Sequence, residues 1–228
     1  MIKNSYSKLY IVSTPIGNLK DITYRAVEVL SSVDLIASED TRRTKILLEH
    51  YGIKKPLISY NDINKLKTTP KILKRLQENS SIALVSDSGT PGISDPMYYL
   101  VKRAISERIE IVPVPGASAL LAGIVVSGLP NDRFVFEGFI PAKKGRKKRL
   151  LRLKDEIRTI ILFESPHRLV KTLEDLKNFL GNRKISIARE ITKIYEEFIR
   201  TDIDSALKLF SEKKPRGEFV LIVEGKDK

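Results

Sequence analysis

The sequence predicts two α/β domains, residues 1–131 and residues 132–228, each built around its own sheet. The first part alternates short β-branched runs with helical periodicities, a pattern typical of parallel strands joined by helices. After the turn at 128–130 the pattern changes, and a short connection between two of the later strands favours antiparallel pairing. We therefore expect a mostly parallel five-stranded sheet with helices on both faces, followed by a mixed sheet.

In the first domain, strands are expected where apolar, β-branched runs occur. These runs are 9–13, 35–38, 57–60, 82–86 and 110–113. Helix starts are expected at capping residues and at prolines. The expected starts are Asp21 as an N-cap, Arg42, Pro70, Asp95 followed by Pro96, and a point near Gly116.

In the second domain, strands are expected at 134–140, 159–163, 184–189, 197–201 and 219–224. Ser165 and Pro166 open a helix that Gly181 closes, and Asp204 is expected to cap another. The third and fourth of these strands are the pair expected to run antiparallel.

Composition narrows the possible functions. The 228 residues include 41 Lys and Arg, 28 Asp and Glu, two His and no Cys, which leaves a formal net charge of +13. Without cysteine the chain has no disulfide, thiolate metal site or cysteine nucleophile, and we expect no metal. No apolar run approaches the ~20 residues that span a bilayer, and no signal peptide is visible, so a cytoplasmic protein is expected.

The densest positive charge lies in residues 142–152, with seven basic side chains and no carboxylate. Such a run suits phosphate backbones, which favours a nucleic-acid partner. The alternative is a solvated basic loop without a partner. A membrane-surface helix is disfavoured because the run lacks an aromatic and leucine face.

Small-residue turns follow three strands of the first domain, at 14–19, 87–95 and 113–119. Open parallel sheets bind ligands at the carboxyl edge of their strands, and glycines there allow close approach of a ligand to the backbone. The Gly-rich dinucleotide fingerprint and the P-loop are both missing. Charged segments also lie at the ends of three expected strands, at 38–43, 163–168 and 188–197. Their side chains either belong to a functional site or form surface ion pairs.

Taken together, these segments resemble one family. The collinear motifs are residues 14–23 (TPIGNLKDIT), 39–42 (EDTR), 86–96 (SDSGTPGISDP), 113–119 (PVPGASA), 138–141 (GFIP), 163–168 (FESPHR) and 188–193 (AREITK). They are similar to those of the small-subunit ribosomal RNA cytidine 2′-O-methyltransferases, within the tetrapyrrole-methylase-like class of S-adenosylmethionine enzymes. Ser88 is a mild departure, since the family usually has Ala there.

The resemblance implies two α/β domains with S-adenosylmethionine in the cleft between them, a homodimer, and small-subunit ribosomal RNA or the 30S subunit as the partner, with no membrane. It also implies residues that line the cofactor. From the first domain these are Pro15, Gly17, Asp87, Gly89, Thr90, Ile93, Ser94, Pro115, Gly116, Ser118 and Ala119, and from the second domain Phe163, Ala188, Gly217 and Glu218.

A ribose hydroxyl is a weak acid, so a base or a nearby cation should assist methyl transfer. The candidates are Glu39, Asp40, Glu190 and Lys193; Lys193 acts either as a base with a lowered pKa or as a cation. We expect phosphates to be bound by Arg42 and Arg43 and by an arm that orders on RNA. The arm's contacting residues are Lys143, Lys144, Arg146, Lys147, Lys148 and Arg149.

Two other functions compete with RNA methylation. One is methylation of a small tetrapyrrole, whose carboxylates would also suit a basic protein. The other is a non-catalytic RNA-binding protein that has kept the fold. Binding of S-adenosylmethionine and the presence of a ribose methyl group on RNA distinguish the three.

Overall fold

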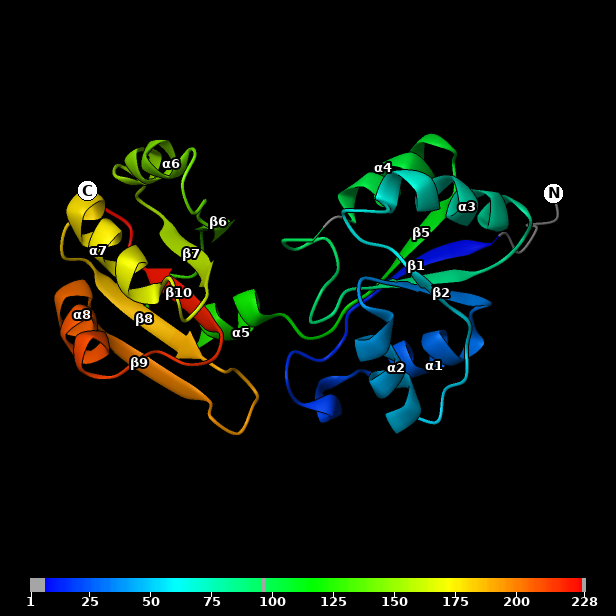
Figure 1. Ribbon diagram of the computed structural model, residues 1–228, viewed down its shortest axis with the longest axis horizontal. Helices are drawn as coiled ribbons and strands as arrows, with labels where there is room; N and C mark the ends of the chain where they lie inside the picture. Colours follow the sequence, from blue (N-terminus) through cyan, green and yellow to red (C-terminus); the bar gives the residue numbers. More distant parts are fainter. Residues whose placement is uncertain (1–6, 96, 227–228) are drawn as a thin grey trace. The chain divides into compact units, whose positions relative to one another are not determined.

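The computed structural model describes residues 7–95 and 97–226, and it forms two units, residues 1–118 and 119–228. Pro96, expected at the start of a helix, lies outside the described residues. The expected boundary was at 131–132. The chain divides earlier because α5 (Ala119–Val125) packs on the second sheet, where Gly123 lies against Val220 and Ile222. Figure 1 shows the elements of each unit.

The first unit is a parallel five-stranded sheet in the order β3-β2-β4-β1-β5. Its strands are β1 (Lys8–Val12), β2 (Leu35–Ser38), β3 (Leu57–Ser59), β4 (Ile82–Val85) and β5 (Glu110–Val114). Its helices are η1 (Leu19–Asp21), α1 (Tyr24–Ser32), α2 (Thr41–His50), α3 (Lys65–Gln77) and α4 (Tyr98–Ser106). The predicted parallel sheet with helices on both faces is confirmed.

The alternation of buried residues along β1 explains the two covered faces. Leu9 packs in a cluster with residues of α3 and α4, whereas Val12 packs in a cluster with residues of α1 and α2. Successive side chains of a strand point to opposite faces, so a strand that is apolar throughout is buried on both sides. Figure 1 shows these helix pairs on opposite faces.

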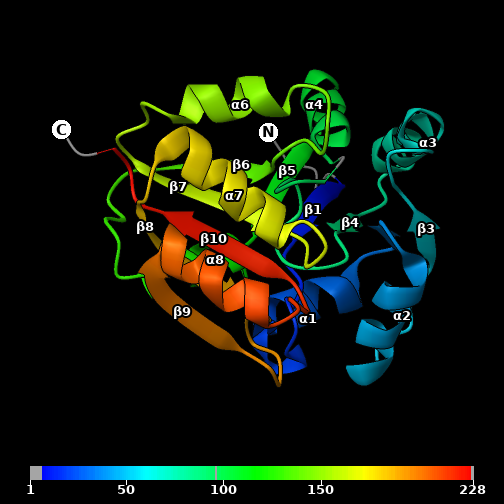
Figure 2. The same cartoon turned by 60° about the vertical axis from the view of Figure 1, so that its left-hand side comes forward.

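The second unit is a mixed sheet, as predicted, and its strand order is β6-β7-β10-β8-β9. Its strands are β6 (Phe134–Phe139), β7 (Thr159–Glu164), β8 (Lys184–Arg189), β9 (Glu197–Asp202) and β10 (Phe219–Val223). β6 and β7 pair in parallel; the other pairs, including β8 with β9, are antiparallel. α7 (Leu169–Leu180) and α8 (Ile203–Glu212) cover one face in Figure 2, and α6 (Arg146–Leu153) packs beside α7.

Several expected helix starts are wrong. α1 begins after Thr23, whose side chain caps Ala26, and not after Asp21. Pro70 lies inside α3, in its second turn, and not at its start. Asp202, not Asp204, caps α8 by accepting a hydrogen bond from the Ser205 amide. In each case another polar residue or turn near the expected start could begin the helix equally well. The spacing of apolar residues does not distinguish between these starts.

The α4 start is also different. Asp95 does not cap α4, which begins at Tyr98, but accepts hydrogen bonds from the amides of Gly92 and Met97 and closes the preceding turn. No helix in the described ranges is long and apolar enough to cross a membrane.

Candidate active site

The three small-residue turns of the first unit are tied together at the carboxyl edge of its sheet. The amides of Thr14 and Gly89 each donate to the other's carbonyl, at 2.9 and 3.1 Å. The Thr90 hydroxyl lies 3.0 Å from the Ser13 hydroxyl and donates to the Ala117 carbonyl at 3.1 Å. Residues from the ends of β1, β4 and β5 therefore form one connected ligand-facing edge.

Glycine is required where these turns approach each other. A Cβ on Gly116 would lie 2.9 Å from the Ser13 Cβ, which is closer than real contacts allow. A Cβ on Gly89, whose φ is +78°, would lie 3.2 Å from a methyl group of Ile16. The backbone at 115–116 is exposed and carries no bulky side chain, so a ligand can approach it closely.

The other predicted cofactor residues of the first unit lie on or beside these turns. Ile93, Ser94 and Gly17 are exposed; Pro15, Thr90 and Ser118 are partly buried. Ser94 has a φ of +69°, in the left-handed region that side chains rarely adopt. Such strained residues gather at functional sites, which supports a ligand-binding role for this turn.

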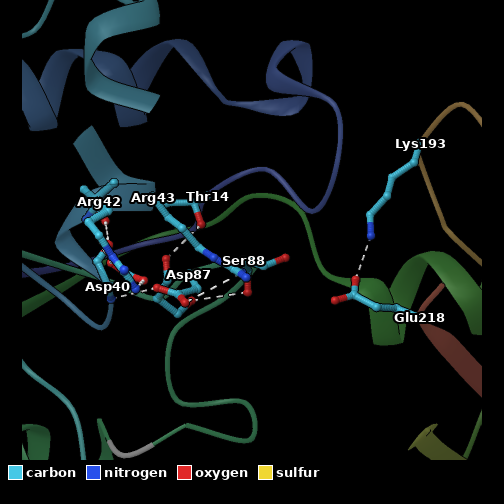
Figure 3. Close-up of polar contacts among 10 residues, drawn as sticks. Thr14, Asp40, Arg42, Arg43, Asp87, Ser88, Lys193 and Glu218 are labelled. Carbon is cyan, nitrogen blue, oxygen red and sulfur yellow. Dashed lines mark hydrogen bonds and ion pairs between the residues drawn. The ribbon is translucent and has the colours of Figure 1, made fainter. Parts of the chain in front are cut away.

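Asp87 holds two segments of the edge together. Its carboxylate accepts a hydrogen bond from the Asp40 amide at 2.8 Å and lies 3.7 Å from the Arg43 guanidinium. Figure 3 shows Asp87 between these two residues. Asp87 thus fixes the start of α2 against the turn that follows β4.

The carboxylates of this edge differ in basicity. Burial, with the negative charges of Asp87 and Asp95, raises the pKa of Glu39 above its ordinary value. The Arg42 guanidinium, hydrogen-bonded to Asp40, lowers the pKa of that carboxyl to about 2. Asp40 is also the N-cap of α2 and accepts from the Arg42 amide. Of these two candidates, only Glu39 has the higher basicity that proton acceptance favours.

In the second unit, Glu190, Lys193 and Glu218 form a compact ionic cluster. The Lys193 ammonium lies 2.9 Å from a Glu190 oxygen and 2.8 Å from a Glu218 oxygen, and Figure 3 draws the second of these contacts. Glu190 also accepts from the Glu218 amide at 2.9 Å. A Cβ on Gly217 would fall 2.5 Å from the Glu190 Cγ, so glycine is needed for this cluster to form.

The cluster keeps Lys193 protonated. Burial acts to lower the pKa of Lys193, but the hydrogen bonds and charges of Glu218 and Glu190 outweigh it and raise the pKa above its ordinary value. Burial acts to raise the pKa of Glu190, but the Lys193 ammonium and the hydrogen bond from the Glu218 amide outweigh it and lower this pKa. The suggested lysine base with a lowered pKa is therefore wrong, whereas the role as a fixed cation fits the structure. Arg189 is held elsewhere, by Glu197 and the Arg216 carbonyl.

The backbone of this loop is strained. Glu190 has a φ of +49° and Thr192 a φ of +67°. The turn is closed by the Thr192 amide, which donates to Glu196 at 2.6 Å. Strain of this kind persists only where surrounding contacts enforce it, and it fixes the position of Lys193. Glu218 is predicted to line the cofactor, but its role as a partner of Lys193 could not be predicted, because 25 positions of the sequence separate the two residues.

The other two predicted cofactor residues of this unit lie on neighbouring strands. Phe163 is partly exposed near the end of β7, and Ala188 is buried in β8. Each pairs with Val220 on opposite sides of β10. The register therefore places them at the same level of the sheet, one residue from the strand end.

The basic arm is already a helix. α6 covers residues 146–153 and buries Leu150 and Leu153, so it does not wait for RNA to order it. Arg146 is largely buried and donates to Asp175 at 2.7 Å and to Thr172 at 2.9 Å. The predicted RNA contact by Arg146 is therefore wrong, because its guanidinium anchors α6 to α7.

The remaining basic residues of the segment face solvent. Lys143, Lys144, Lys147 and Lys148 are exposed, and Arg149, also exposed, forms an ion pair with Glu137 at 3.0 Å. Arg42 and Arg43 are exposed at the start of α2, each beside a carboxylate. In the described parts of the chain, no group of three His, Asp or Glu side chains is arranged to hold a metal ion.

Comparison with known proteins identifies the family. Residues 8–207 match the model of the tetrapyrrole (corrin/porphyrin) methylases. The chain belongs to this family. It is 53% identical to the ribosomal RNA small subunit methyltransferase I of Synechocystis sp. over 95% of this chain and 78% of that protein. It is 50% identical to the protein of the same name from Thermotoga maritima, over 96% of this chain and 99% of that protein.

Solved structures of this family share the fold. A diphthine synthase matches with a TM-score of 0.75 at 16% identity, covering 96% of this chain and 90% of that one. A cobalt precorrin-4 methyltransferase matches with a TM-score of 0.68 at 18% identity, covering 95% and 94%. At these identities the likeness shows the fold alone. The predicted methylase-like fold is therefore confirmed.

The residues at the edge of the first unit fit a sulfonium methyl donor. The turns are small and glycine-bearing, as close packing of an adenosine moiety against backbone requires. Glu39 lies near the carboxylates of Asp87 and Asp95, whose negative charge adds to the effect of burial in raising its pKa. A positively charged sulfonium is favoured beside such carboxylates. Methyl transfer from S-adenosylmethionine needs no resident metal.

Proposed function

We propose that this protein transfers the methyl group of S-adenosylmethionine to the 2′-hydroxyl of a cytidine in the RNA of the small ribosomal subunit. The observation that carries the substrate class is the identity of about half the residues, over nearly the full chain, with relatives named ribosomal RNA small subunit methyltransferase I. We propose further that it works in the cytoplasm as a homodimer.

The donor is held by the first unit in this proposal. The turns after β1, β4 and β5 bind its adenosine and amino-acid parts through small side chains and exposed backbone, and Asp87 fixes their arrangement. When bound, S-adenosylmethionine supplies an activated methyl group. The protein then places the ribose oxygen in line with that methyl, at about 3 Å, which removes most of the entropic barrier.

Glu39 accepts the hydroxyl proton in this proposal. It is partly buried, and its raised pKa makes it the most basic of the three candidate carboxylates. Asp40 and Glu190 are bound to cations, which lower their pKa values and their affinity for a proton. Lys193 remains protonated and supplies a fixed positive charge to the negatively charged RNA.

RNA is bound through phosphates by the exposed lysines of residues 143–148 and by Arg42 and Arg43. Because α6 is already packed on α7, no ordering of the arm opposes binding. Each phosphate contact contributes affinity that falls as salt rises.

The test is methylation by the full chain in vitro. Small subunits from a strain lacking the corresponding enzyme are incubated with the protein and S-adenosylmethionine, and the RNA is digested and analysed by mass spectrometry. We expect one additional ribose methyl group on cytidine. A tetrapyrrole methyltransferase would bind the donor and leave the RNA unchanged; a non-catalytic RNA-binding protein would bind RNA and not the donor.

A further inference from the structure

The second unit contains a cavity that none of the roles above uses. Its volume is about 440 Å³, and it lies between the carboxyl end of α8, the following residues 213–216, and the strands β8 and β9. All of its lining residues belong to this unit. A volume in the range of roughly 300 to 1,000 Å³ is typical of cavities that hold a small ligand or one residue of a polymer.

One side of the cavity is apolar. Ile199, Leu209, Phe210 and Pro215 form this surface, and the Phe210 ring is fixed by an edge contact with Phe219, with centroids 5.9 Å apart. Leu209 is 38% exposed, although most leucines of this unit are buried. A flat apolar group inserted here would cover surface that water now contacts.

The rim is cationic. Lys213, Lys214 and Arg216 are exposed and follow one another within four residues. The two carboxylates that line the cavity are Glu197 and Glu212, and Glu197 is already ion-paired with Arg189. The positive charge therefore exceeds the negative charge, and an anionic group is favoured at the rim.

Arg189 forms a wall that is fixed in advance. Its side chain is only 18% exposed; its Nε donates to the Arg216 carbonyl at 2.7 Å, and one terminal nitrogen donates to Glu197 at 3.2 Å. A guanidinium has five N–H donors, so these bonds leave several for a ligand. Its planar face is also a surface on which nucleobases stack.

The cavity adjoins the Lys193 cluster through the chain itself. Arg189 directly precedes Glu190, and Arg216 directly precedes Gly217 and Glu218. The two chain segments that form the wall and the rim therefore continue directly into the residues that position Lys193. This continuity favours a polymer that contacts both places.

We propose that this cavity binds one unpaired nucleotide of the RNA substrate, next in the strand to the nucleotide that is methylated. The base lies on the apolar side and against Arg189, and its phosphate is bound by Lys214 and Arg216. This inference rests on the proposed function and extends it, because it assigns a second nucleotide-binding position. Single-stranded RNA is read by such combinations of stacking surface and cationic groove.

The first experiment uses the double variant Lys214→Ala, Arg216→Ala in the full chain. The substitution at 216 keeps the backbone carbonyl that holds Arg189, so the wall of the cavity is preserved. We expect the dissociation constant for small-subunit RNA to rise about tenfold and the salt slope to become shallower by about one, with affinity for S-adenosylmethionine unchanged.

The matched control is Lys208→Ala combined with Lys71→Ala. Both residues are exposed, neither lines the cavity, and the change in charge is the same. If the double variant binds RNA as tightly as this control, the proposal is wrong. If Lys214 and Arg216 serve only to stabilise the end of α8, the double variant has a lower melting temperature and an unchanged affinity for RNA. This result also overturns the proposal.

A second experiment uses the unaltered protein. Small-subunit RNA carrying 4-thiouridine at single positions near the target is irradiated in the complex, and the attached peptide is identified by mass spectrometry. We expect attachment within residues 209–216 from a position adjoining the methylated nucleotide; attachment elsewhere from every such position contradicts the proposal. If the wild type does not methylate RNA at all, it is the proposed function that fails and not only this cavity's role.

Discussion

The two candidate edges of the molecule pair their charges differently. In the first unit, Glu39 is partly buried, and burial together with the negative charges of Asp87 and Asp95 raises its pKa. In the second unit, Lys193 and Arg189 are each bound to neighbouring carboxylates, which hold these cations in place and balance their charge. The comparison teaches that the first edge offers a basic carboxylate, whereas the second offers a fixed cation.

The edges are also held together by different contacts. The first uses backbone and hydroxyl hydrogen bonds between turns, as between Thr14 and Gly89. The second uses ion pairs and left-handed residues such as Glu190. Substitutions at the two edges should therefore separate donor binding and proton acceptance in the first unit from the role of the Lys193 cation in the second, and the following experiments test that separation.

The largest effect is expected from Glu39→Gln. If Glu39 accepts the proton, kcat should fall about 1,000-fold with little change in the affinity for either substrate. In the wild type, activity is lost as pH falls through the raised pKa of Glu39, so the acid limb should lie at a higher pH than for an ordinary carboxyl. A loss confined to donor affinity, with kcat unchanged, would instead make Glu39 a binding residue.

A smaller loss in kcat, of about several hundred-fold, is expected from Lys193→Met. Lys193→Arg keeps the charge and should retain much more activity. Because the pKa of Lys193 is raised, deprotonation of this residue should not activate the wild type between about pH 7 and pH 9. If the activity of the wild type increases with pH across this range and that of Lys193→Met does not, Lys193 acts as a base after all.

Arg146→Ala tests whether α6 is a docked helix. The variant leaves Asp175 buried without its closest cation, and we expect a loss of about 3 kcal/mol in unfolding free energy, or roughly 10 °C in melting temperature. Arg152→Ala, on the exposed side of the same helix, should change stability by less than about 0.5 kcal/mol. Equal stability of the two variants by calorimetry would mean that the Arg146 contact does not anchor the helix.

Replacing Lys143, Lys144, Lys147 and Lys148 by Ala should weaken RNA binding about 30-fold. The salt dependence should become shallower by about three to four, because each lost phosphate contact removes close to one unit of slope. Donor affinity should remain unchanged. The control replaces Lys67, Lys71, Lys74 and Lys102, exposed residues of the first unit, by Ala. If both variants lose RNA affinity equally, the effect comes from net charge alone and not from this segment.

The smallest effect is expected from Gly116→Ala. The added Cβ would meet Ser13, so the turns must separate by several tenths of an ångström. We expect the dissociation constant for S-adenosylmethionine to rise about tenfold in calorimetric titration, while RNA affinity stays the same. A variant that binds the donor normally and loses RNA would reverse the assignment of the first unit.

Much of the fold could be predicted from the sequence, since apolar runs of five or six residues mark strands directly. The strands β2 and β8 have the predicted bounds. β1 is shifted by one residue as a whole, and each of the other strands differs from its predicted range by one residue at its end. The helix starts were less accurate. Thr23 and Asp202 cap α1 and α8, and Asp21 and Asp204 lie too close to them for sequence spacing to choose.

The segments of the candidate site could be brought together from the sequence, but their contacts could not. The strand ends predicted that the turns at Gly89 and Gly116 lie at one edge of the sheet, because the carboxyl ends of parallel strands share that edge. The partner of Arg146 lies 29 positions away on another helix, and no local pattern could reveal that a basic residue in a basic run is buried. The same holds for Lys193, whose pKa depends on Glu218, brought close only by β10.

The most direct test of the account is mass spectrometry of small-subunit RNA after incubation with the protein and S-adenosylmethionine. The account predicts one new methyl group on the ribose of a cytidine, absent with Glu39→Gln. A methyl group on a base, or RNA that remains unmodified while the donor binds tightly, would contradict it.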